Sequence, residues 1–309
     1  MNSLPKVIAI LGPTASGKTD LGIFLAKKFN GEVVNFDSRQ IYIGMNIATA
    51  KPEGCWKKDG GRKVFLVDDV PHHLMDFVNP NDAFSLSDFK NDAFAAIDDI
   101  LSRGKLPILV GGTGLYFWGV IDNLDLTQTP PNLELRAELE KQSLDERVKL
   151  LQEKDPDSCN LIDLKNPRRV LRALEVVLST GKPFVANQKK NNPRYEVLQL
   201  GITRERAELN TRIDQRVDQQ IKAGLLDETK ELSQKYSWGL PSMSSIGYRQ
   251  VGYFLRGEMS FEEAVEILKR DTRRYAKRQM TWFRRDVRII WLKKPWAENA
   301  MAEIKKFLS

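Results

Sequence analysis

The residues with the clearest chemical potential form a Gly-x-x-x-x-Gly-Lys-Thr spacing over positions 12–19. Gly12 and Gly17 allow the backbone to wrap around an anion, Lys18 supplies a positive charge, and the hydroxyl of Thr19 can bind Mg²⁺. Many proteins use such a loop to hold the phosphates of ATP or GTP, and the same groups suit another phosphorylated substrate. A glycine-rich turn that matches by chance is the alternative interpretation.

A phosphate loop needs a strand before it and a helix after it, because the helix N-terminus then directs free N–H groups at the anion. The apolar, β-branched run at 6–11 predicts the strand. After the loop, Leu21, Leu25 and Phe29 recur at helical spacing. The sequence therefore predicts a strand–loop–helix unit that binds a phosphate group.

Further strands are expected at 31–37 and 106–112, with a helix at 85–103 between them. This alternation predicts an α/β fold with a parallel sheet. Ligands of such sheets bind beyond the carboxyl ends of the strands, so Asp37 should face the phosphate loop as a base or a metal partner. A turn residue or a helix cap is the simpler interpretation of Asp37. The strand at 106–112 ends in glycines and not in the acid that common ATPases place there, which disfavours a motor or switch ATPase.

Composition limits the function further. The 309 residues carry a formal net charge of +7, which favours a polyanionic partner. No apolar run is long enough to span a bilayer and no signal peptide is recognisable, so we expect a cytoplasmic protein without a membrane partner. Cys55 and Cys159 have no metal-ligand spacing, and His72 and His73 are expected to be structural.

Two stretches are rich in arginine. Residues 127–198 are expected to form a helical insertion between the two parts of a catalytic core, 1–126 and 199–309. In it, a helix starting at Asn166 and Pro167 has a buried stripe at Val170, Leu174, Val177 and Leu178, with arginines on another face. A second helix begins with a capping box at Ser260 and Glu263 and carries a basic cluster over 269–285. Both stretches are suited to nucleic-acid phosphates, although a solvated basic face is the plainer reading.

Eight motifs in a fixed order indicate a family. These are GPTASGKT at 12–19, DSRQIYIGMNIATAKP at 37–52, HHLMD at 72–76, GGTGLY at 111–116, NPRRVLRALEV at 166–176, RIDQRVDQQIKAGLLDE at 212–228, SIGYRQ at 245–250 and RRYAKRQMTWFR at 273–284. Together they resemble the bacterial tRNA dimethylallyltransferases over nearly the whole chain. The resemblance implies a P-loop NTPase-like sheet flanked by helices with a helical insertion.

The resemblance also implies the reaction. The family transfers a dimethylallyl group from dimethylallyl diphosphate to N6 of adenine 37, next to the anticodon of tRNAs that read codons beginning with U. The phosphate loop would then hold an isoprenoid diphosphate, with Mg²⁺ as cofactor and the tRNA anticodon stem-loop as partner. A monomer is expected.

Positions matching the family's motifs acquire roles by the same resemblance. Asp37 matches the general base, and Lys18 and Thr113 match catalytic residues. The diphosphate would be bound by Gly12, Pro13, Thr14, Ala15, Ser16, Gly17, Lys18, Thr19 and Arg216, with Thr19 also binding the metal. The positions that match tRNA contacts are Asp37, Ser38, Arg39, Gln40, Thr113, Arg136, Arg168, Arg169, Val170, Leu171, Arg172, Gly247, Tyr248, Arg249, Lys277, Arg278, Gln279, Trp282 and Arg284. The chain departs from the family at Phe36, usually a small residue, and at Arg39, usually Met.

Two other functional classes remain as alternatives. A P-loop kinase of a small metabolite would consume ATP without RNA, and an RNA-binding protein could carry a vestigial phosphate loop. The intact set Lys18, Thr19, Asp37 and Thr113 disfavours a vestigial loop, and the arginine-rich insertion disfavours the kinase. Transfer to free AMP is a variant of the first function that the basic cluster at 269–285 disfavours.

Overall fold

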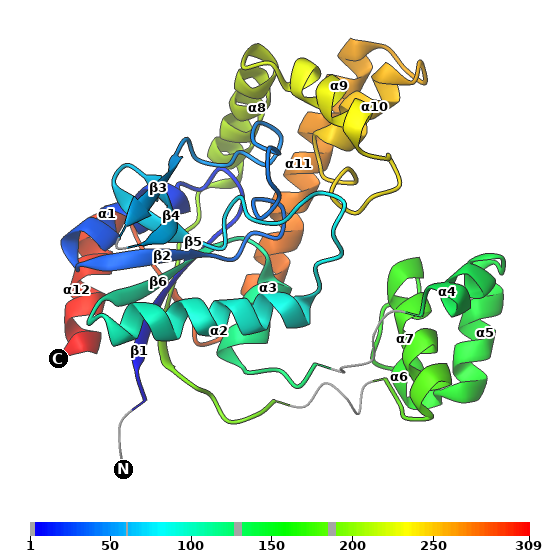
Figure 1. Cartoon of the computed structure of the whole chain (residues 1–309), viewed down its shortest axis with the longest axis horizontal. Helices are drawn as coiled ribbons and strands as arrows, with labels where there is room; N and C mark the ends of the chain where they lie inside the picture. Colours follow the sequence, from blue (N-terminus) through cyan, green and yellow to red (C-terminus); the bar gives the residue numbers. More distant parts are fainter. Residues whose placement is uncertain (1–3, 60, 127–131, 185–189) are drawn as a thin grey trace. The chain divides into compact units, whose positions relative to one another are not determined.

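Apolar and β-branched segments build the central sheet of the computed structural model, which describes residues 4–59, 61–126, 132–184 and 190–309. Within these residues the sheet has eight strands in the order β3-β4-β5-β2-β6-β1-β7-β8. They are β1 (Lys6–Leu11), β2 (Gly31–Asn35), β3 (Cys55–Asp59), β4 (Arg62–Val67), β5 (Val70–His73), β6 (Leu106–Gly111), β7 (Glu196–Gly201) and β8 (Ile290–Trp291). The run from β5 to β8 is parallel, and β3 and β4 extend it as antiparallel strands at one edge. The predicted α/β fold with a mainly parallel sheet is confirmed (Figure 1).

The register of the central strands brings three loops together. Leu11, the last residue of β1, pairs with Gly111, the last residue of β6. On the other side of β6, Asn35 at the end of β2 pairs with Val110. The segments that follow β2, β6 and β1 therefore leave the same edge of the sheet from neighbouring strands, which is where ligands bind in open α/β sheets.

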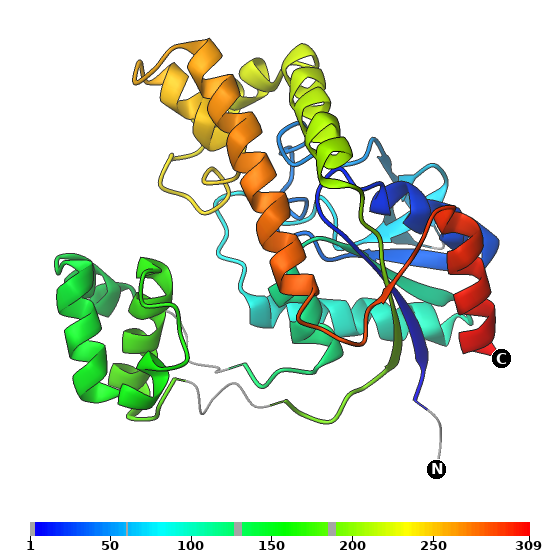
Figure 2. The ribbon, with the colours of Figure 1, turned by 180° about the vertical axis from the view of Figure 1, so that it is seen from behind.

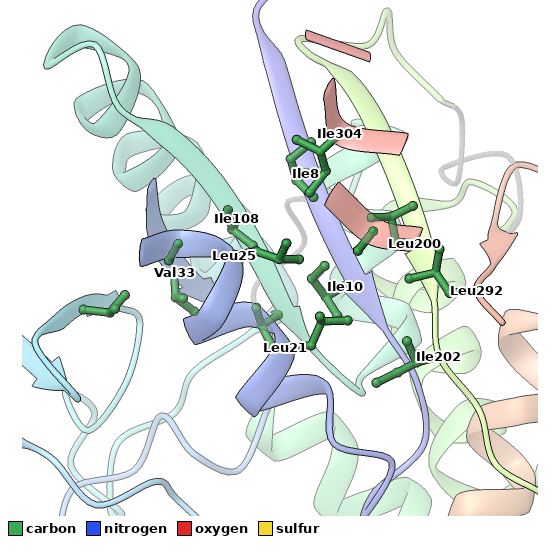
Figure 3. Close-up of a cluster of buried hydrophobic side chains, with 14 residues drawn as sticks. Ile8, Ile10, Leu21, Leu25, Val33, Ile108, Leu200, Ile202, Leu292 and Ile304 are labelled. Carbon is green, nitrogen blue, oxygen red and sulfur yellow. The ribbon is translucent and has the colours of Figure 1, made fainter. Parts of the chain in front are cut away.

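One face of the sheet is covered by α1 (Lys18–Lys28) and α12 (Trp296–Leu308). Figure 3 shows Ile10 of β1 near Leu21 and Leu25 of α1, and Ile8 of β1 beside Ile304 of α12. Alternate residues of β1 point to the opposite face. The helix α2 (Leu86–Ser102) packs against β2 and β6, and a capping box between Ser85 and Asp88 fixes its start, as the expected helix at 85–103 requires.

The chain forms two compact units, and the one that contains the sheet has five further helices among its described residues. These are α3 (Gly114–Ile121), α8 (Arg206–Lys222), α9 (Leu225–Lys235), α10 (Tyr248–Leu255) and α11 (Phe261–Phe283). The helix α11 begins at the predicted capping box, in which Ser260 and Glu263 bond each other's backbone N–H groups. It runs beside α8 and α10, and both views show it descending to α3 (Figures 1 and 2). No helix of the described residues is long and apolar enough to cross a membrane.

The second compact unit covers 121–193 and contains α4 (Leu133–Glu140), α5 (Leu144–Lys154), α6 (Pro156–Cys159) and α7 (Pro167–Thr180). Leu139 of α4, Leu151 of α5 and the inner side of α7 make its core. Val170, Leu174 and Val177 are buried as the helical period predicts, whereas Leu178 is exposed. An antiparallel bridge between Leu124 and Lys190 joins the two ends of the unit.

The predicted boundaries of the insertion need a correction. The expected range was 127–198, but β7 begins at Glu196 and pairs with β1 from Lys6 onward, so 196–198 belong to the core sheet. At the other end the compact unit begins at Ile121, before the predicted start at 127, which itself lies outside the described residues. Periodicity marks helices well but does not reveal where a chain leaves one core for another.

A buried carboxylate on β2 links this strand to β5 and to the residues that precede β6. Glu32 of β2, with a 3% exposed side chain, accepts hydrogen bonds from Arg103 and Lys105 and contacts Nε2 of His73 at 2.7 Å. His72 is buried beside the carbonyl of Val70, and burial lowers its pKa to about 4, so this imidazole is neutral at pH 7. Both histidines therefore have structural surroundings, as expected, and Cys55 and Cys159 are free thiols.

We expect Glu32→Gln to destabilise the fold by about 1 to 3 kcal/mol at pH 7, the range for hydrogen bonds to a charged group. Burial alone would raise the pKa of Glu32, but the hydrogen bonds from Arg103, His73 and Lys105 hold it well below the ordinary 4.5. Because the folded-state pKa is depressed, the stabilisation is complete above 4.5 and is lost as pH falls below it. Urea unfolding of both proteins over this range should show the difference shrinking on acidification, and a constant difference would exclude the ionic contribution.

Candidate active site

The phosphate loop lies between β1 and α1, as predicted. Gly17 precedes the helix with a φ of +99°, a backbone conformation that residues with a side chain rarely adopt. A Cβ on Gly12 would lie 2.6 Å from the carbonyl oxygen of Ile202, so any residue larger than glycine at position 12 would collide with the backbone that follows β7. The loop is thus shaped by backbone requirements at the two glycines of the motif.

Three arginines that are distant from this loop in the sequence form hydrogen bonds with three of its consecutive residues. Arg216 donates from Nη1 to Oγ1 of Thr14 at 3.1 Å, and Arg212, one turn earlier on α8, donates from Nε to the carbonyl of Ala15 at 3.0 Å. Arg204 donates from Nε to the carbonyl of Ser16 at 3.0 Å. The structure brings Arg216 to the loop as expected. The contacts of Arg204 and Arg212 were missed, although the four-residue spacing of Arg212 from Arg216 was a usable signal.

Lys18 lies close to Asp37 and Arg216. Its Nζ donates to the carbonyl of Pro13 at 3.3 Å. Burial lowers the pKa of Lys18 to about 8, an effect that the negative charge of Asp37 opposes and the positive charge of Arg216 reinforces. Lys18, Arg216 and Asp37 therefore lie together beside the phosphate loop, where Arg204 and Arg212 add further positive charge.

Asp37 follows β2 and begins a tight turn. Its Oδ1 accepts from the backbone N–H of Arg39 at 2.9 Å, and its own N–H donates to Oδ1 of Asn35 at 3.2 Å. The turn interpretation is therefore correct for the local structure. It does not exclude the catalytic one, because the same carboxylate lies close enough to Lys18 to influence its pKa.

Thr113 connects the segment after β6 to the segment after β2. Its Oγ1 accepts from the N–H of Ser38 at 3.1 Å, and its hydroxyl lies 3.3 Å from Oγ of Ser38. The side chains of Thr113 and Tyr275 of α11 share a hydrogen bond, and burial, reinforced by Asp37, raises the pKa of Tyr275 to about 12. Thr113, Ser38 and Asp37 therefore lie together, as the neighbouring ends of β2 and β6 require.

The two departures from the family pattern have clear positions. Phe36 is buried, with its ring centroid 5.2 Å from that of Phe117, and a Cβ on Gly111 would lie 2.6 Å from its ring. The large side chain thus fits because β6 ends in glycine. Arg39 donates from Nη1 to the carbonyl of Pro241 at 2.6 Å, which ties the turn after β2 to the segment before α10.

The segment after this turn is held from several sides. Gln40 donates from Nε2 to the carbonyls of Thr49 and Ala50, so half of its amide is engaged within the segment. Glu228 of α9 accepts from the N–H of Ile47 at 2.9 Å and from the hydroxyl of Tyr248 at 2.6 Å. Glu228 is the last residue of the motif at 212–228, but its sequence context does not indicate these contacts.

Several residues matched to tRNA contacts have buried side chains, and their contact with tRNA stays a prediction. Val170 and Leu171 lie in the core of the helical unit, and Tyr248 is fully buried against Glu228. Gln279 is 5% exposed and is bonded to the phosphate loop. Gly247 is buried with a φ of +105°, and a Cβ there would lie 2.6 Å from that of Ala48. In each case the residue packs inside the fold, so a contact with RNA there would have to involve the backbone.

The other matched residues are at least partly exposed, and their roles stay predictions. Arg136 and Arg172 converge on Glu175, whose side chain is fully buried, and the exposed Arg168 lies on the same helix as Arg172. On the first unit they are Arg249, Lys277, Arg278, Trp282 and Arg284. Trp282 stacks on Trp118 with centroids 4.9 Å apart, and its neighbour Phe283 is fully buried.

Comparison with known proteins identifies the family. The IPP transferase family model matches residues 40–286. A tRNA dimethylallyltransferase of Acetivibrio thermocellus is 44% identical, covering 94% of this chain and 92% of its own, and that of Thermomicrobium roseum is 42% identical over 100% and 93%. Among solved structures, the tRNA isopentenylpyrophosphate transferase of Bacillus halodurans superposes with a TM-score of 0.69 at 38% identity, covering 98% of this chain and 95% of its own. A eukaryotic dimethylallyltransferase acting on tRNA gives a TM-score of 0.77 at 30% identity, over 97% and 77%. The chain belongs to the IPP transferase family.

Proposed function

We propose that this chain transfers a dimethylallyl group from dimethylallyl diphosphate to N6 of adenine 37 in tRNA, giving N6-isopentenyladenosine and diphosphate. The observation that carries the proposal is the meeting of Lys18, Asp37 and Thr113 at the ends of β1, β2 and β6. An anion-binding loop and a carboxylate base then face one reacting centre. Relatives that share most of the chain carry this activity in their names.

The phosphate loop supports departure of the diphosphate. Negative charge grows on the leaving group as its bond to the allylic carbon breaks, and preorganised cations stabilise that charge. The Lys18 ammonium and the Arg216 guanidinium lie at the loop, and the N-terminus of α1 points its free N–H groups there. The cradle is thus complementary to the product diphosphate as well as to the substrate.

Asp37 supplies the base for the acceptor. Adenine N6 is a poor nucleophile, and attack on the allylic carbon leaves an additional proton on nitrogen. The Asp37 carboxylate accepts that proton, and its turn with Arg39 fixes the orientation of the carboxylate. Thr113, bonded to Ser38, follows β6, the strand that lies between β2 and β1 in the sheet.

The residues at the loop fit Mg²⁺ as the cofactor. Mg²⁺ usually keeps several waters and takes only one or two protein ligands besides phosphate oxygens. Thr19 at the start of α1 offers one hydroxyl, and no cluster of three His, Cys, Asp or Glu side chains occurs among the described residues. When bound, the metal would neutralise charge on the diphosphate.

The direct test is transfer itself. The protein is incubated with dimethylallyl diphosphate, Mg²⁺ and an anticodon stem-loop that presents A36, A37 and A38, and the RNA is examined by mass spectrometry. We expect the mass of one dimethylallyl group on a single adenine. Consumption of ATP without RNA would favour a kinase, and RNA binding without product would favour a non-catalytic protein.

Asp37→Asn should lower the transfer rate by about 10² to 10⁴, the usual cost of losing a general base, with tRNA affinity unchanged. Asparagine retains the oxygen that accepts from Arg39, so the turn is preserved. The same change at exposed Asp82 is the control. A transfer rate near that of the parent protein would remove Asp37 from the mechanism.

The efficiency of transfer, kcat/KM for dimethylallyl diphosphate, should fall as pH rises through about 8, where Lys18 loses its proton in the free enzyme. The protonated lysine attracts the diphosphate, and the neutral lysine does not. In Lys18→Arg the side chain stays charged, so the decline near pH 8 should vanish even where the rate is lower. Rates measured from about pH 6 to pH 10 check this, and an identical decline in both proteins would assign it to another group.

The affinity for tRNA should fall steeply with salt, because cations that bind phosphates release counterions from the RNA. Arg274 has a 63% exposed side chain and only a 3.9 Å ion pair with Asp271, whereas Arg273 is bonded closely to Asp214. Arg274→Gln should therefore weaken cognate and non-cognate tRNA alike and reduce the salt slope by about one unit, with a smaller effect for Arg273→Gln. Equal slopes for Arg274→Gln and the parent protein would place this face of α11 outside the RNA path.

A further inference from the structure

We propose that Gln279 is a positioning residue that sets the spacing between the phosphate loop and the segment after β6, and thereby between the two halves of the reaction. The inference rests on the proposed function for its catalytic consequence. Its structural part concerns only contacts inside the chain. The expected contact of Gln279 with tRNA is the competing role that the experiment below tests.

The side chain of Gln279 bridges two loops with both ends of its amide. Oε1 accepts from the N–H of Thr14 at 2.8 Å, and Nε2 donates to the carbonyl of Gly112 at 2.8 Å. The residue is 5% exposed. Two short hydrogen bonds to backbone groups in a buried place form a rigid link, because an unpaired partner there would be costly.

Neighbouring residues of α11 make contacts on the same two loops. Ala276 packs with Ala15 of the phosphate loop, and Tyr275 shares a hydrogen bond with Thr113. Trp282 lies against Gly114, where a Cβ would be 3.2 Å from its ring. One side of the helix thus fits along the seam between the loops, with Gln279 at the centre as the residue that bonds both.

The link joins the donor and acceptor parts of the site. Thr14 belongs to the loop that carries Lys18, while Gly112 immediately precedes Thr113, which holds Ser38 beside Asp37. A change in the spacing of the loops would therefore move the base relative to the leaving group. A displacement of about 1 Å in such a geometry can cost about 10²-fold in rate.

Only glutamine satisfies both contacts. Glutamate can accept from Thr14 but would place an oxygen against the carbonyl of Gly112, and methionine has the length but not the hydrogen bonds. Asparagine is one methylene shorter. On the other side of the contact, a Cβ on Gly112 would lie 2.3 Å from Nε2 of Gln279, so Gly112→Ala should displace the same amide.

The test compares Gln279→Met with Gln234→Met, the same change at an exposed position of α9. For Gln279→Met we expect kcat to fall about tenfold to 10²-fold, with the tRNA dissociation constant close to that of the control. The protein should still be folded at the assay temperature, although the unpaired Thr14 N–H and Gly112 carbonyl lower its melting temperature. A loss of tRNA affinity at unchanged kcat would make Gln279 an RNA contact and overturn the proposal. A fall of kcat that only reflects unfolding at the assay temperature would also overturn it.

A double-mutant cycle separates the link from general packing. Gly112→Ala alone should slow transfer like Gln279→Met, but in a Gln279→Ala background, where the amide is absent, it should add nothing. Additive losses would show that the two residues act independently. The cycle also keeps the proposal testable if Gln279→Met does not fold.

A measurement independent of activity distinguishes this proposal from the proposed function. In the full chain without ligand, hydrogen exchange at the Thr14 N–H should quicken in Gln279→Met and stay slow in Gln234→Met. Unchanged exchange would refute the link whatever the enzyme's activity. Faster exchange in a protein that proves unable to transfer the dimethylallyl group would retain the link and reject the proposed function.

Discussion

Parallel pairing of β2, β6 and β1 is the constraint on which the site depends. Because these strands are neighbours with matched ends, the residues after Asn35, Gly111 and Leu11 must leave the sheet at one edge. A carboxylate, a hydroxyl and an anion-binding loop, far apart in the sequence, are thereby brought together. Gly111 leaves room for the Phe36 ring at the same edge, so the core packs closely next to the site.

The charged side chains at this edge of the sheet lie close enough to influence one another's pKa. Lys18 and Arg216 lie near the carboxylate of Asp37, and burial lowers the pKa of Lys18. Such a site favours a polyanion, whose charge would restore the protonated lysine. The arginines at 204, 212 and 216 bind the loop itself, so the loop is held in shape before any ligand arrives.

The helix α11 has two different sides. Its inner side meets both loops of the site through Tyr275, Ala276 and Gln279, and its outer side exposes Lys277 and Arg278. An RNA that binds the outer side would therefore contact the same helix that bonds the loops holding the reacting groups. In the proposed reaction, this explains why a basic helix and a phosphate loop occur in one chain.

The sequence by itself determined the strand–loop–helix unit, the parallel sheet, the capping box at Ser260 and the stripe at Val170, because each rests on local geometry or on the helical period. It also indicated that Asp37 faces the phosphate loop, since parallel strands share an edge, whereas Thr113 was indicated only by the family resemblance. Only the tertiary structure decided which polar side chains point inward. Gln279 and Tyr248 lie among motif residues whose local pattern is equally compatible with exposure, yet both are buried and bonded to distant segments. The boundary of the helical unit was likewise set by the pairing of β7 with β1, a contact between residues too far apart in sequence for any local pattern to encode.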